Sequence, residues 1–245
     1  MLGSIKSAAL ATVILVASAL SAEEPQVHYL GFNLFGPDKI GSGRVFDAYM
    51  KKLQPIMARY GVTAEPYTVL NGGSKMLSAD VITFGTAKDQ ASFQAFFQDA
   101  ALQEIFPMLV GALDGHQVIF TAGPFSPSVQ EEQNHLLLSA NWLKGAAGAS
   151  LAKLSSITEN ATQIFGKYGA FIEARATGVF SNQGLTGEIK KTVPPHLLEV
   201  RSIRDAHGLF DDPLMIDANM AAKKLLSRTE NFWIIKRDFA DHNHK

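Results

Sequence analysis

The sequence contains no cysteine among its 245 residues. This absence excludes disulfide bonds and the lipid-modified cysteine of a lipoprotein. An excess of charge of one sign is also lacking, because 22 Lys and Arg residues face 23 Asp and Glu residues and the formal net charge is −1. Nucleic-acid-binding domains usually carry a basic patch or stripe. The composition therefore argues against a nucleic acid as a partner.

The short motifs of common catalytic and cofactor sites are missing as well. The sequence has no HExxH, no GxSxG, no Walker loop and no GxGxxG. The seven histidines show no ligand spacing; they are His28, His116, His135, His196, His207, His242 and His244. The polar tail 240–245, which contains DHNHK, is expected to be solvated. We therefore predict no metal site and no cofactor.

Long hydrophobic runs are also rare, and the clearest one lies at the N-terminus. Lys6 precedes a run of small and apolar residues from Ala8 to Ala22, which is typical of a secretory signal peptide. We expect a signal peptide at 1–22, cleaved after Ala19 or Ala22. The run is shorter than the roughly 20 residues of a membrane-spanning helix, although an uncleaved anchor is the alternative. Export without disulfides favours a bacterial periplasm.

The residues from 27 to 125 alternate between strand and helix patterns. Expected strands cover 27–35, 62–70, 78–85 and 116–123, and expected helices cover 44–60 and 88–113, the second interrupted near Pro107. Gly61 is expected to end the first helix in the left-handed conformation. The order strand, helix, strand, strand, helix, strand is that of a ferredoxin-like unit. A polar stretch with two prolines, 124–133, is expected to be a linker.

The same order returns in a second unit at 134–239. The segments IMARYG (Ile56 to Gly61) and IFGKYG (Ile164 to Gly169) lie 108 residues apart. The same offset pairs Tyr60 with Tyr168, Gly61 with Gly169, Asn33 with Asn141 and Glu65 with Glu173. The motif FxD recurs at an offset of 113, at Phe97 and Phe210. These matches indicate an internal repeat, and the alternative is two unrelated segments of similar class.

Each half resembles the dimeric α+β barrel superfamily. The segment FDAYMKKLQPIMARYG, a following strand, GG, and ADVITFGTAKDQASFQAFFQD are similar to small stand-alone domains near the antibiotic-biosynthesis monooxygenases and EthD-like proteins. The resemblance is closer over 27–125 than over 135–237, and it lies in element order and helix-end motifs. It implies an α+β fold in which two tandem ferredoxin-like units pack sheet to sheet as one barrel. The chain would then be a monomer that forms its own pseudo-dimer, with a higher oligomer through pairing of edge strands between chains as the alternative.

A four-stranded sheet with helices on one face needs a cover for the other face, and a second copy can supply it. Strand alternation divides the side chains between the two faces. We expect the helices to meet Leu30, Phe32, Leu34, Leu138, Ala140 and Trp142. We expect the space between the sheets to hold Tyr29, Asn33, Phe35, Glu65, Tyr67, Thr83, Ser139, Asn141, Glu173, Arg175, Thr177, Glu199 and Arg201. This predicts a polar ligand pocket between the sheets.

Roles follow for the members of that set. The predicted ligand-binding residues are Tyr29, Asn33, Glu65, Tyr67, Asn141, Arg175 and Arg201. Glu173 and Glu199 are the candidate catalytic bases, since a desolvated carboxylate can suit proton abstraction. The alternative is that these charges only form cross-strand ion pairs. An isolated carboxylate would favour an enzyme, whereas fully paired charges would favour binding or a structural role.

Three functions remain open at this point. The first is an exported small-molecule-binding protein, with its ligand between the sheets. The second, implied by the resemblance, is a cofactor-independent oxygenase or isomerase acting on an aromatic or polyketide-like molecule, with Asn33 or Asn141 holding a substrate oxygen. The third is a structural protein without a pocket. Haem binding occurs in the wider superfamily, and His196 or His207 would be the candidate ligands.

Overall fold

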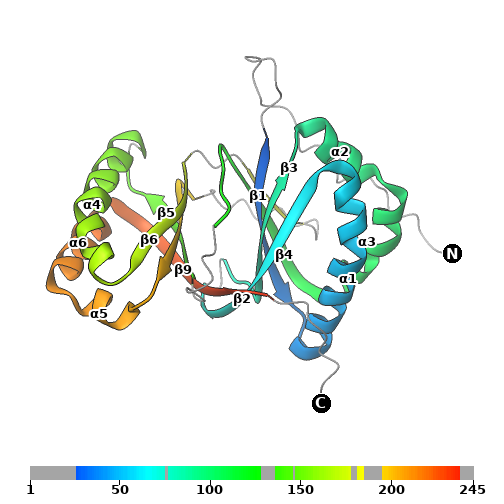
Figure 1. The fold of residues 1–245 in the computed structure, drawn as a ribbon, viewed down its shortest axis with the longest axis horizontal. Helices are drawn as coiled ribbons and strands as arrows, with labels where there is room; N and C mark the ends of the chain where they lie inside the picture. The colour runs from blue at the N-terminus through cyan, green and yellow to red at the C-terminus, as the bar shows by residue number, and fades with distance from the viewer. Residues whose placement is uncertain are drawn as a thin grey trace.

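The computed structural model describes residues 26–74, 77–127, 136–145, 147–177, 181–184 and 195–237. Figure 1 shows two groups of helices on opposite sides of the molecule with all of the strands between them. Within the described ranges, no helix combines the length and apolar character that a membrane span requires. The predicted signal peptide, most of the expected linker and the polar tail lie outside the described residues.

The first unit contains four strands and three helices. In chain order they are β1 (Val27–Phe35), α1 (Lys39–Tyr60), β2 (Val62–Gly72), β3 (Val81–Ala87), α2 (Gln90–Gln98), α3 (Ala100–Ala112) and β4 (Leu113–Thr121). The expected single helix over 88–113 is two helices, because Asp99 has extended backbone angles and caps the second of them. Pro107 lies inside α3 and does not end it.

The second unit repeats this order with one additional strand. Its elements are β5 (Leu136–Leu143), α4 (Ala147–Lys167), β6 (Ala170–Thr177), β7 (Ser181–Gly184), β8 (Leu197–Ile203), α5 (Ala206–Asp211), α6 (Pro213–Leu225) and β9 (Leu226–Lys236). Helices α1 and α4 both end at a glycine in the left-handed conformation, Gly61 at φ 61° and Gly169 at φ 60°. A glycine adopts this conformation without the steric penalty of a Cβ atom.

Each unit has the strand order of a ferredoxin-like fold, and the two units share one sheet. The order is β6-β8-β5-β9-β2-β3-β1-β4-β7, and every pairing within it is antiparallel. Strand β9 of the second unit pairs with β2 of the first, and β7 pairs with β4. Because β7 follows β6 closely in the chain, its pairing with β4 brings the two ends of the sheet together. The expected tandem α+β barrel is confirmed.

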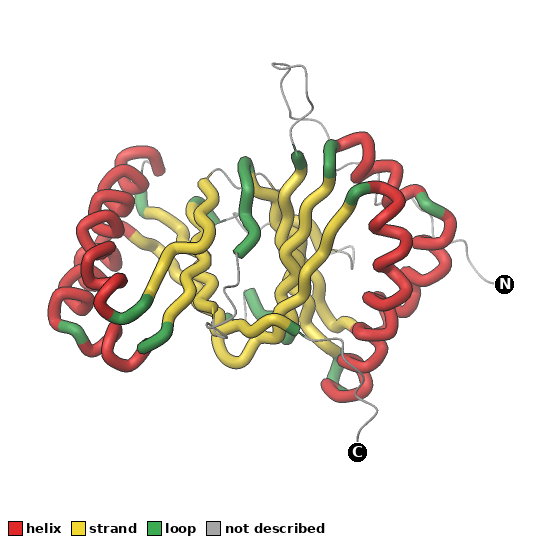
Figure 2. Tube along the Cα trace, viewed as in Figure 1, coloured by secondary structure: helices red, strands yellow, loops and turns green. Residues whose placement is uncertain are grey.

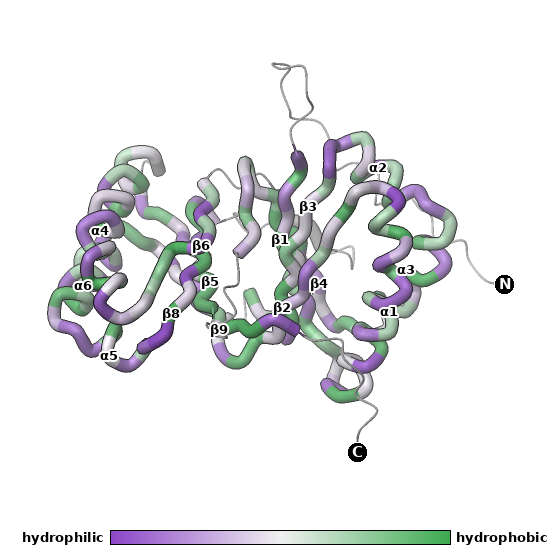
Figure 3. The backbone as a smooth tube through the Cα atoms, viewed as in Figure 1, coloured by the Kyte–Doolittle hydropathy of each residue, from purple (hydrophilic) through white to green (hydrophobic). Residues whose placement is uncertain are grey.

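The strands of each unit form one wall of the barrel, referred to below as the sheet of that unit. The space between these two sheets is filled by apolar side chains from both units. This central core includes Leu30, Phe32, Tyr67, Ile82, Phe84, Ile119, Leu136, Leu138, Ala140, Trp142, Leu198, Val200, Phe232 and Ile234. The rings of Phe32 and Phe232 lie 5.6 Å apart across the two units. Figure 2 shows the strands of both units facing each other, and Figure 3 shows hydrophobic stretches along them.

The expected assignment of strand faces is therefore wrong for the first strand of each unit. Leu30, Phe32, Leu138, Ala140 and Trp142 were expected beneath the helices and lie between the sheets instead. The opposite face of each strand packs against helices: Phe35 joins α1 and α3 in one core, and Leu137 joins α4 and α6 in another. The physical reason is that the space between two sheets is the driest part of the barrel, so it receives the most apolar side chains.

Candidate functional site

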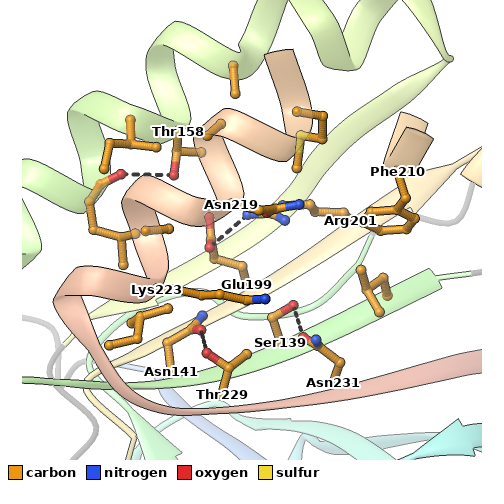
Figure 4. A pocket seen from close by; sticks show the side chains of 18 of the residues that line it. Ser139, Asn141, Thr158, Glu199, Arg201, Phe210, Asn219, Lys223, Thr229 and Asn231 are labelled. Carbon is orange, nitrogen blue, oxygen red and sulfur yellow. Dashed lines mark hydrogen bonds and ion pairs between the residues drawn. The ribbon is translucent and has the colours of Figure 1, made fainter. Parts of the chain in front are cut away.

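A pocket of about 320 Å³ lies in the second unit, between its sheet and helices α4 and α6. Its apolar lining consists of Leu137, Leu154, Ile157, Ala161, Phe165, Phe210, Met215, Ala218, Ala222, Leu226 and Trp233. Its polar lining consists of Ser139, Asn141, Thr158, Glu199, Arg201, Asn219, Lys223, Thr229 and Asn231. A mostly apolar concavity with a few convergent polar groups is typical of a small-molecule site. Figure 4 shows the sheet as its floor and the two helices as its roof.

Part of the roof is open because α4 carries smaller residues than α1 at three positions. The two helices begin 108 residues apart, at Lys39 and Ala147, and end at the same motif. At that offset, the buried α1 residues Phe46, Met50 and Leu53 correspond to Leu154, Thr158 and Ala161. Each replacement shortens a side chain or removes a branch. At these three positions, volume that α1 fills in the first unit is left open in the second, although Leu151 and Phe165 are larger than their counterparts Gly43 and Met57.

The floor also differs between the two units. In the first unit, Tyr29 packs on Phe93 with ring centroids 5.3 Å apart, and its ring lies across Gly85, where a Cβ atom would meet it at 2.0 Å. The register places Leu137 opposite Arg201 where the first unit has Tyr29 opposite Gly85. Leu137 thus takes the place of the Tyr29 ring, and Arg201, which lines the pocket, takes the place of Gly85.

A buried carboxylate between two guanidinium groups forms the charged wall of the pocket. Glu199 is 2% exposed. Its Oε1 accepts hydrogen bonds from Arg175 Nε and Nη2 at 3.1 and 2.8 Å, and its Oε2 accepts one from Arg201 Nη2 at 3.0 Å. The guanidinium of Arg201 also lies 5.2 Å from the ring centre of Phe165. This pairing offsets the cost of burying the carboxylate, and it means that Glu199 is not an isolated base.

Two polar pairs between β5 and β9 form the middle of the floor. Ser139 Oγ donates to Asn231 Oδ1 at 2.8 Å, and Thr229 Oγ1 donates to Asn141 Oδ1 at 3.0 Å. Lys223 extends from α6 over these pairs (Figure 4). The floor therefore offers hydroxyl and amide groups that are already oriented by one another, with one ammonium group above them.

The repeat partner of Asn141, Asn33, lies beneath the helices of the first unit. Asn33 Nδ2 donates to Thr83 Oγ1 at 3.2 Å, and Asn33 Oδ1 lies 2.7 Å from His116 Nδ1. Burial lowers the pKa of His116 to about 4, so the ring is neutral near pH 7. Both asparagines and Thr83 were expected between the sheets and lie on the helix side instead. Only Asn141 of these three reaches the pocket.

The remaining predicted site residues are dispersed. Tyr29 lies against the helices of the first unit and its hydroxyl donates to Thr63 O at 3.1 Å. Tyr67 does lie between the sheets, fully buried, beside the exposed Glu65. Burial raises the pKa of Tyr67 above its ordinary value. Glu173 accepts a hydrogen bond from Ser202 and does not line the pocket. The structure thus brings together Asn141, Glu199 and Arg201, with Arg175 behind Glu199.

Several lining residues were not found by sequence reasoning, among them Lys223, Thr229 and Asn231 from α6 and β9. Strand faces were assigned from the sequence only for the first three strands of each unit, so the side chains of β9 and α6 were not considered. A residue-by-residue comparison of the repeats would have helped. It sets Leu154, Thr158 and Ala161 against larger residues and so indicates where the second unit is less filled.

Neither histidine that the resemblance suggested for haem lies at the pocket. His196 Nδ1 accepts the backbone N–H of Leu143 at 3.0 Å, and His207 is 92% exposed and paired with Asp211. The described residues that line the pocket include no histidine, so they do not offer an imidazole ligand for haem. No group of three or more His, Asp and Glu side chains in the described parts of the chain could hold a metal ion.

The topology defines the class first: two ferredoxin-like units in one polypeptide form a single α+β barrel, the fold of the dimeric α+β barrel proteins. Solved structures with this fold include an anthrone oxidase-like protein, at 10% identity and TM-score 0.54, with coverage of 91% of this chain and 97% of that one. A candidate monooxygenase from Lactobacillus acidophilus NCFM has 7% identity and TM-score 0.51, with 87% and 94% covered. A mutant chlorite dismutase from Candidatus Nitrospira defluvii has 8% identity and TM-score 0.53, with 88% and 92% covered.

These similarities extend over nearly the whole length of each compared chain and concern the fold alone. No protein-family model matches the sequence, and no curated protein matches it. One fold can host unrelated chemistries. Function therefore has to be argued from the pocket itself.

Proposed function

We propose that this protein binds a small, mostly apolar molecule in the pocket between the second unit's sheet and helices α4 and α6. The observation that carries the proposal is the pocket itself, about 320 Å³ in volume and lined by eleven apolar and nine polar residues. Its volume is at the lower end of the usual range for ligand sites. This places the ligand beneath the helices, whereas the sequence predicted it between the sheets. A formed pocket also argues against the purely structural alternative.

The pairing of Glu199 favours binding over carboxylate-based catalysis. A general base needs a carboxylate that is free to accept a proton from the substrate. Both oxygens of Glu199 already accept hydrogen bonds from arginines. An isolated carboxylate would favour an enzyme, and paired charges favour binding or a structural role, so the pairing of Glu199 supports the second group and the open pocket supports binding within it.

Binding is tested with a neutral apolar fluorophore, N-phenyl-1-naphthylamine, whose emission rises in an apolar site. We expect saturable binding with one site per chain. Ala218→Phe should weaken it by about tenfold or more, because the new ring occupies the pocket. Met220→Phe adds a ring on the same helix where the side chain is 51% exposed, and should leave binding unchanged. Equal binding by both variants would contradict a site in this pocket.

An oxygenase acting on a small aromatic or polyketide-like molecule is the second candidate function. The support for it is that structures of this fold include proteins described as a monooxygenase and as anthrone oxidase-like. Native mass spectrometry of the purified protein would identify a co-purifying molecule. Oxygen uptake with that molecule, abolished in Ala218→Phe, would support catalysis, and binding without uptake would leave a binding protein.

We also propose that the chain is exported, on the basis of Lys6 and the apolar run from Ala8 to Ala22. The full-length chain would be expressed in a bacterium with a C-terminal tag and the compartments separated. A periplasmic product whose mass begins after Ala19 or Ala22 is the expected result. An uncleaved product in the membrane fraction would favour the anchor.

A further inference from the structure

The charges around the pocket are not balanced, and this imbalance selects the chemistry of a ligand. Of the described residues that line it, Glu199 is acidic, whereas Arg201 and Lys223 are basic. Arg175 stands behind Glu199 as a third cation. Glu199 can neutralise one guanidinium, so the buried Arg175–Glu199–Arg201 group retains one positive charge before Lys223 is counted.

Arg201 has an unused donor in a dry position. Its Nη2 is engaged by Glu199, but its Nε is fully shielded from solvent and has no hydrogen-bond partner. A buried donor without an acceptor is costly, and such groups are rare in folded proteins. The side chain is 16% exposed, so the guanidinium still reaches the pocket. Because Nε itself has no accessible surface, an acceptor oxygen from the pocket would meet the exposed part of the guanidinium group rather than Nε.

Lys223 supplies the second cation from the opposite wall. Its backbone belongs to the last turn of α6, and its side chain lies over the Ser139–Asn231 and Asn141–Thr229 pairs (Figure 4). A lysine can cover apolar surface with its stem and present its ammonium group to a ligand. Apart from Thr158 and Asn219, the rest of the lining is apolar or aromatic, including Phe165, Phe210 and Trp233.

We propose that the ligand is a small organic carboxylate, with its carboxylate at Arg201 and Lys223 and an aromatic or aliphatic body against α4 and α6. This inference rests on the proposed binding function and specifies its ligand class. One spare charge in the buried group and a largely apolar lining suit a single carboxylate on an apolar body better than a multiply charged, strongly hydrated anion.

The test compares two probes of the same shape, 2-naphthoate and the neutral 2-naphthalenemethanol, by isothermal titration calorimetry at pH 7.5. A charge-assisted hydrogen bond contributes enough for a preference of about tenfold or more. We expect the carboxylate to bind at least that much more tightly than the alcohol. The preference should fall as salt rises, although a buried pair is screened less than a surface pair.

Variants assign the preference to residues. Lys223→Gln and Arg201→Gln should each reduce it severalfold, and affinity for the alcohol should change little. Lys224→Gln alters the neighbouring exposed lysine, which does not line the pocket, and is the matched control. Glu199→Gln should act in the opposite direction and tighten carboxylate binding, because it removes the only acidic group of the lining. Lys223 is exposed, so its variant remains informative if Arg201→Gln fails to fold.

The outcomes separate the two proposals. A carboxylate preference that falls in Lys223→Gln and rises in Glu199→Gln supports the inference. Equal affinities for the two probes, unaffected by these variants but lost in Ala218→Phe, would overturn the carboxylate while the pocket remains a binding site. Failure of both probes and of the neutral fluorophore to bind would overturn the proposed function as well.

Discussion

The helix-end motif that repeats in the two units connects three side chains in the same way each time. Tyr60 Oη donates to Asp99 Oδ2 at 2.7 Å, and Arg59 pairs with the same carboxylate at 3.0 Å. Asp99 is also the N-cap of α3 and accepts the backbone N–H of Ala101 at 2.7 Å. The motif therefore ties the end of α1 to the beginning of α3.

The second unit repeats this connection. Tyr168 Oη donates to Asp212 Oδ2 at 2.8 Å, Lys167 pairs with Asp212 at 3.0 Å, and Asp212 caps α6. The offset changes from 108 at the tyrosine to 113 at the aspartate because the segments between them differ in length: the connection from β6 to β8, which contains β7, is longer than the one from β2 to β3. The repeat is kept here for structural reasons.

These tyrosines should make stability depend on pH in the acid range. The hydrogen bond from tyrosine is the main cause that holds the pKa of Asp99 and of Asp212 below the ordinary value. A lowered folded-state pKa contributes stability above the unfolded value near 4, which is lost as pH falls through the folded value. Tyr60→Phe and Tyr168→Phe should therefore lower the melting temperature at pH 6, and the deficit should shrink by pH 3.

Differential scanning fluorimetry between pH 3 and pH 6 measures this deficit. Tyr29→Phe is the matched control, because the Tyr29 hydroxyl donates to the carbonyl oxygen of Thr63 rather than to a carboxylate. The loss of melting temperature in Tyr29→Phe should be the same at every pH. If the loss in Tyr60→Phe is also independent of pH, the pKa of Asp99 does not depend on the hydrogen bond from Tyr60.

At the scale of elements, the junction between β2 and β9 is the most constrained strand pairing between the units. Gly72 has φ 125°, and a Cβ atom there would lie 2.0 Å from Asn231 O. The register shifts at this point, between Val69 and Asn71. Glycine permits the close approach of the two backbones, and other residues would force them apart.

Gly72→Ala should therefore destabilise the protein by about 1–3 kcal/mol or more, the usual cost of a residue held in such a conformation, with the clash added to it. Gly111→Ala is the control, since Gly111 lies inside α3 with nothing within 4 Å of its Cβ position. That change should stabilise by roughly 0.5–1 kcal/mol. Urea unfolding of the unmodified protein and the two variants measures both changes in the free energy of unfolding. An unchanged free energy in Gly72→Ala would contradict the close approach of the β2 and β9 backbones.

The elements could be predicted from the sequence to a useful extent, and their faces could not. Gly61 and Gly169 marked the helix ends, and β1 was predicted with its observed bounds. The faces failed because β5 is buried along its whole length, so alternation of burial gives no preference there. Polar residues such as Asn33, Ser139 and Glu199 were predicted to lie between the sheets, at an interior ligand site. They are instead buried beneath amphipathic helices, where each forms a hydrogen bond or an ion pair with another side chain.

For a related reason, only part of the candidate site could be predicted from the sequence. Asn141, Glu199 and Arg201 are on strands and were named from their polarity. The empty volume beside them depends on the small size of side chains on α4 and α6. Small side chains in a single helix do not by themselves indicate a cavity. It becomes visible only when α4 is compared with α1, residue by residue.

At the scale of the whole molecule, the two units share one core and are tied at their ends. Phe32 and Phe232 meet between the sheets. Arg237, which follows β9, donates to both carboxylate oxygens of Asp47 on α1 at 2.7 and 2.9 Å, and to Thr68 Oγ1 at 3.1 Å. A bidentate pair of this kind fixes geometry as well as charge. The second unit thus ends on a helix of the first.

We therefore expect the chain to be a monomer that unfolds in one cooperative transition rather than one transition per unit. Phe232→Ala should lower the stability by about 3–5 kcal/mol, and the whole transition should move together, because the residue belongs to a core that both units build. Phe171→Ala, at a side chain that is 54% exposed, should change little. Calorimetry gives the test: equal calorimetric and van't Hoff enthalpies indicate one unit of unfolding, whereas two transitions, only one of them shifted by Phe232→Ala, would mean that the units fold independently.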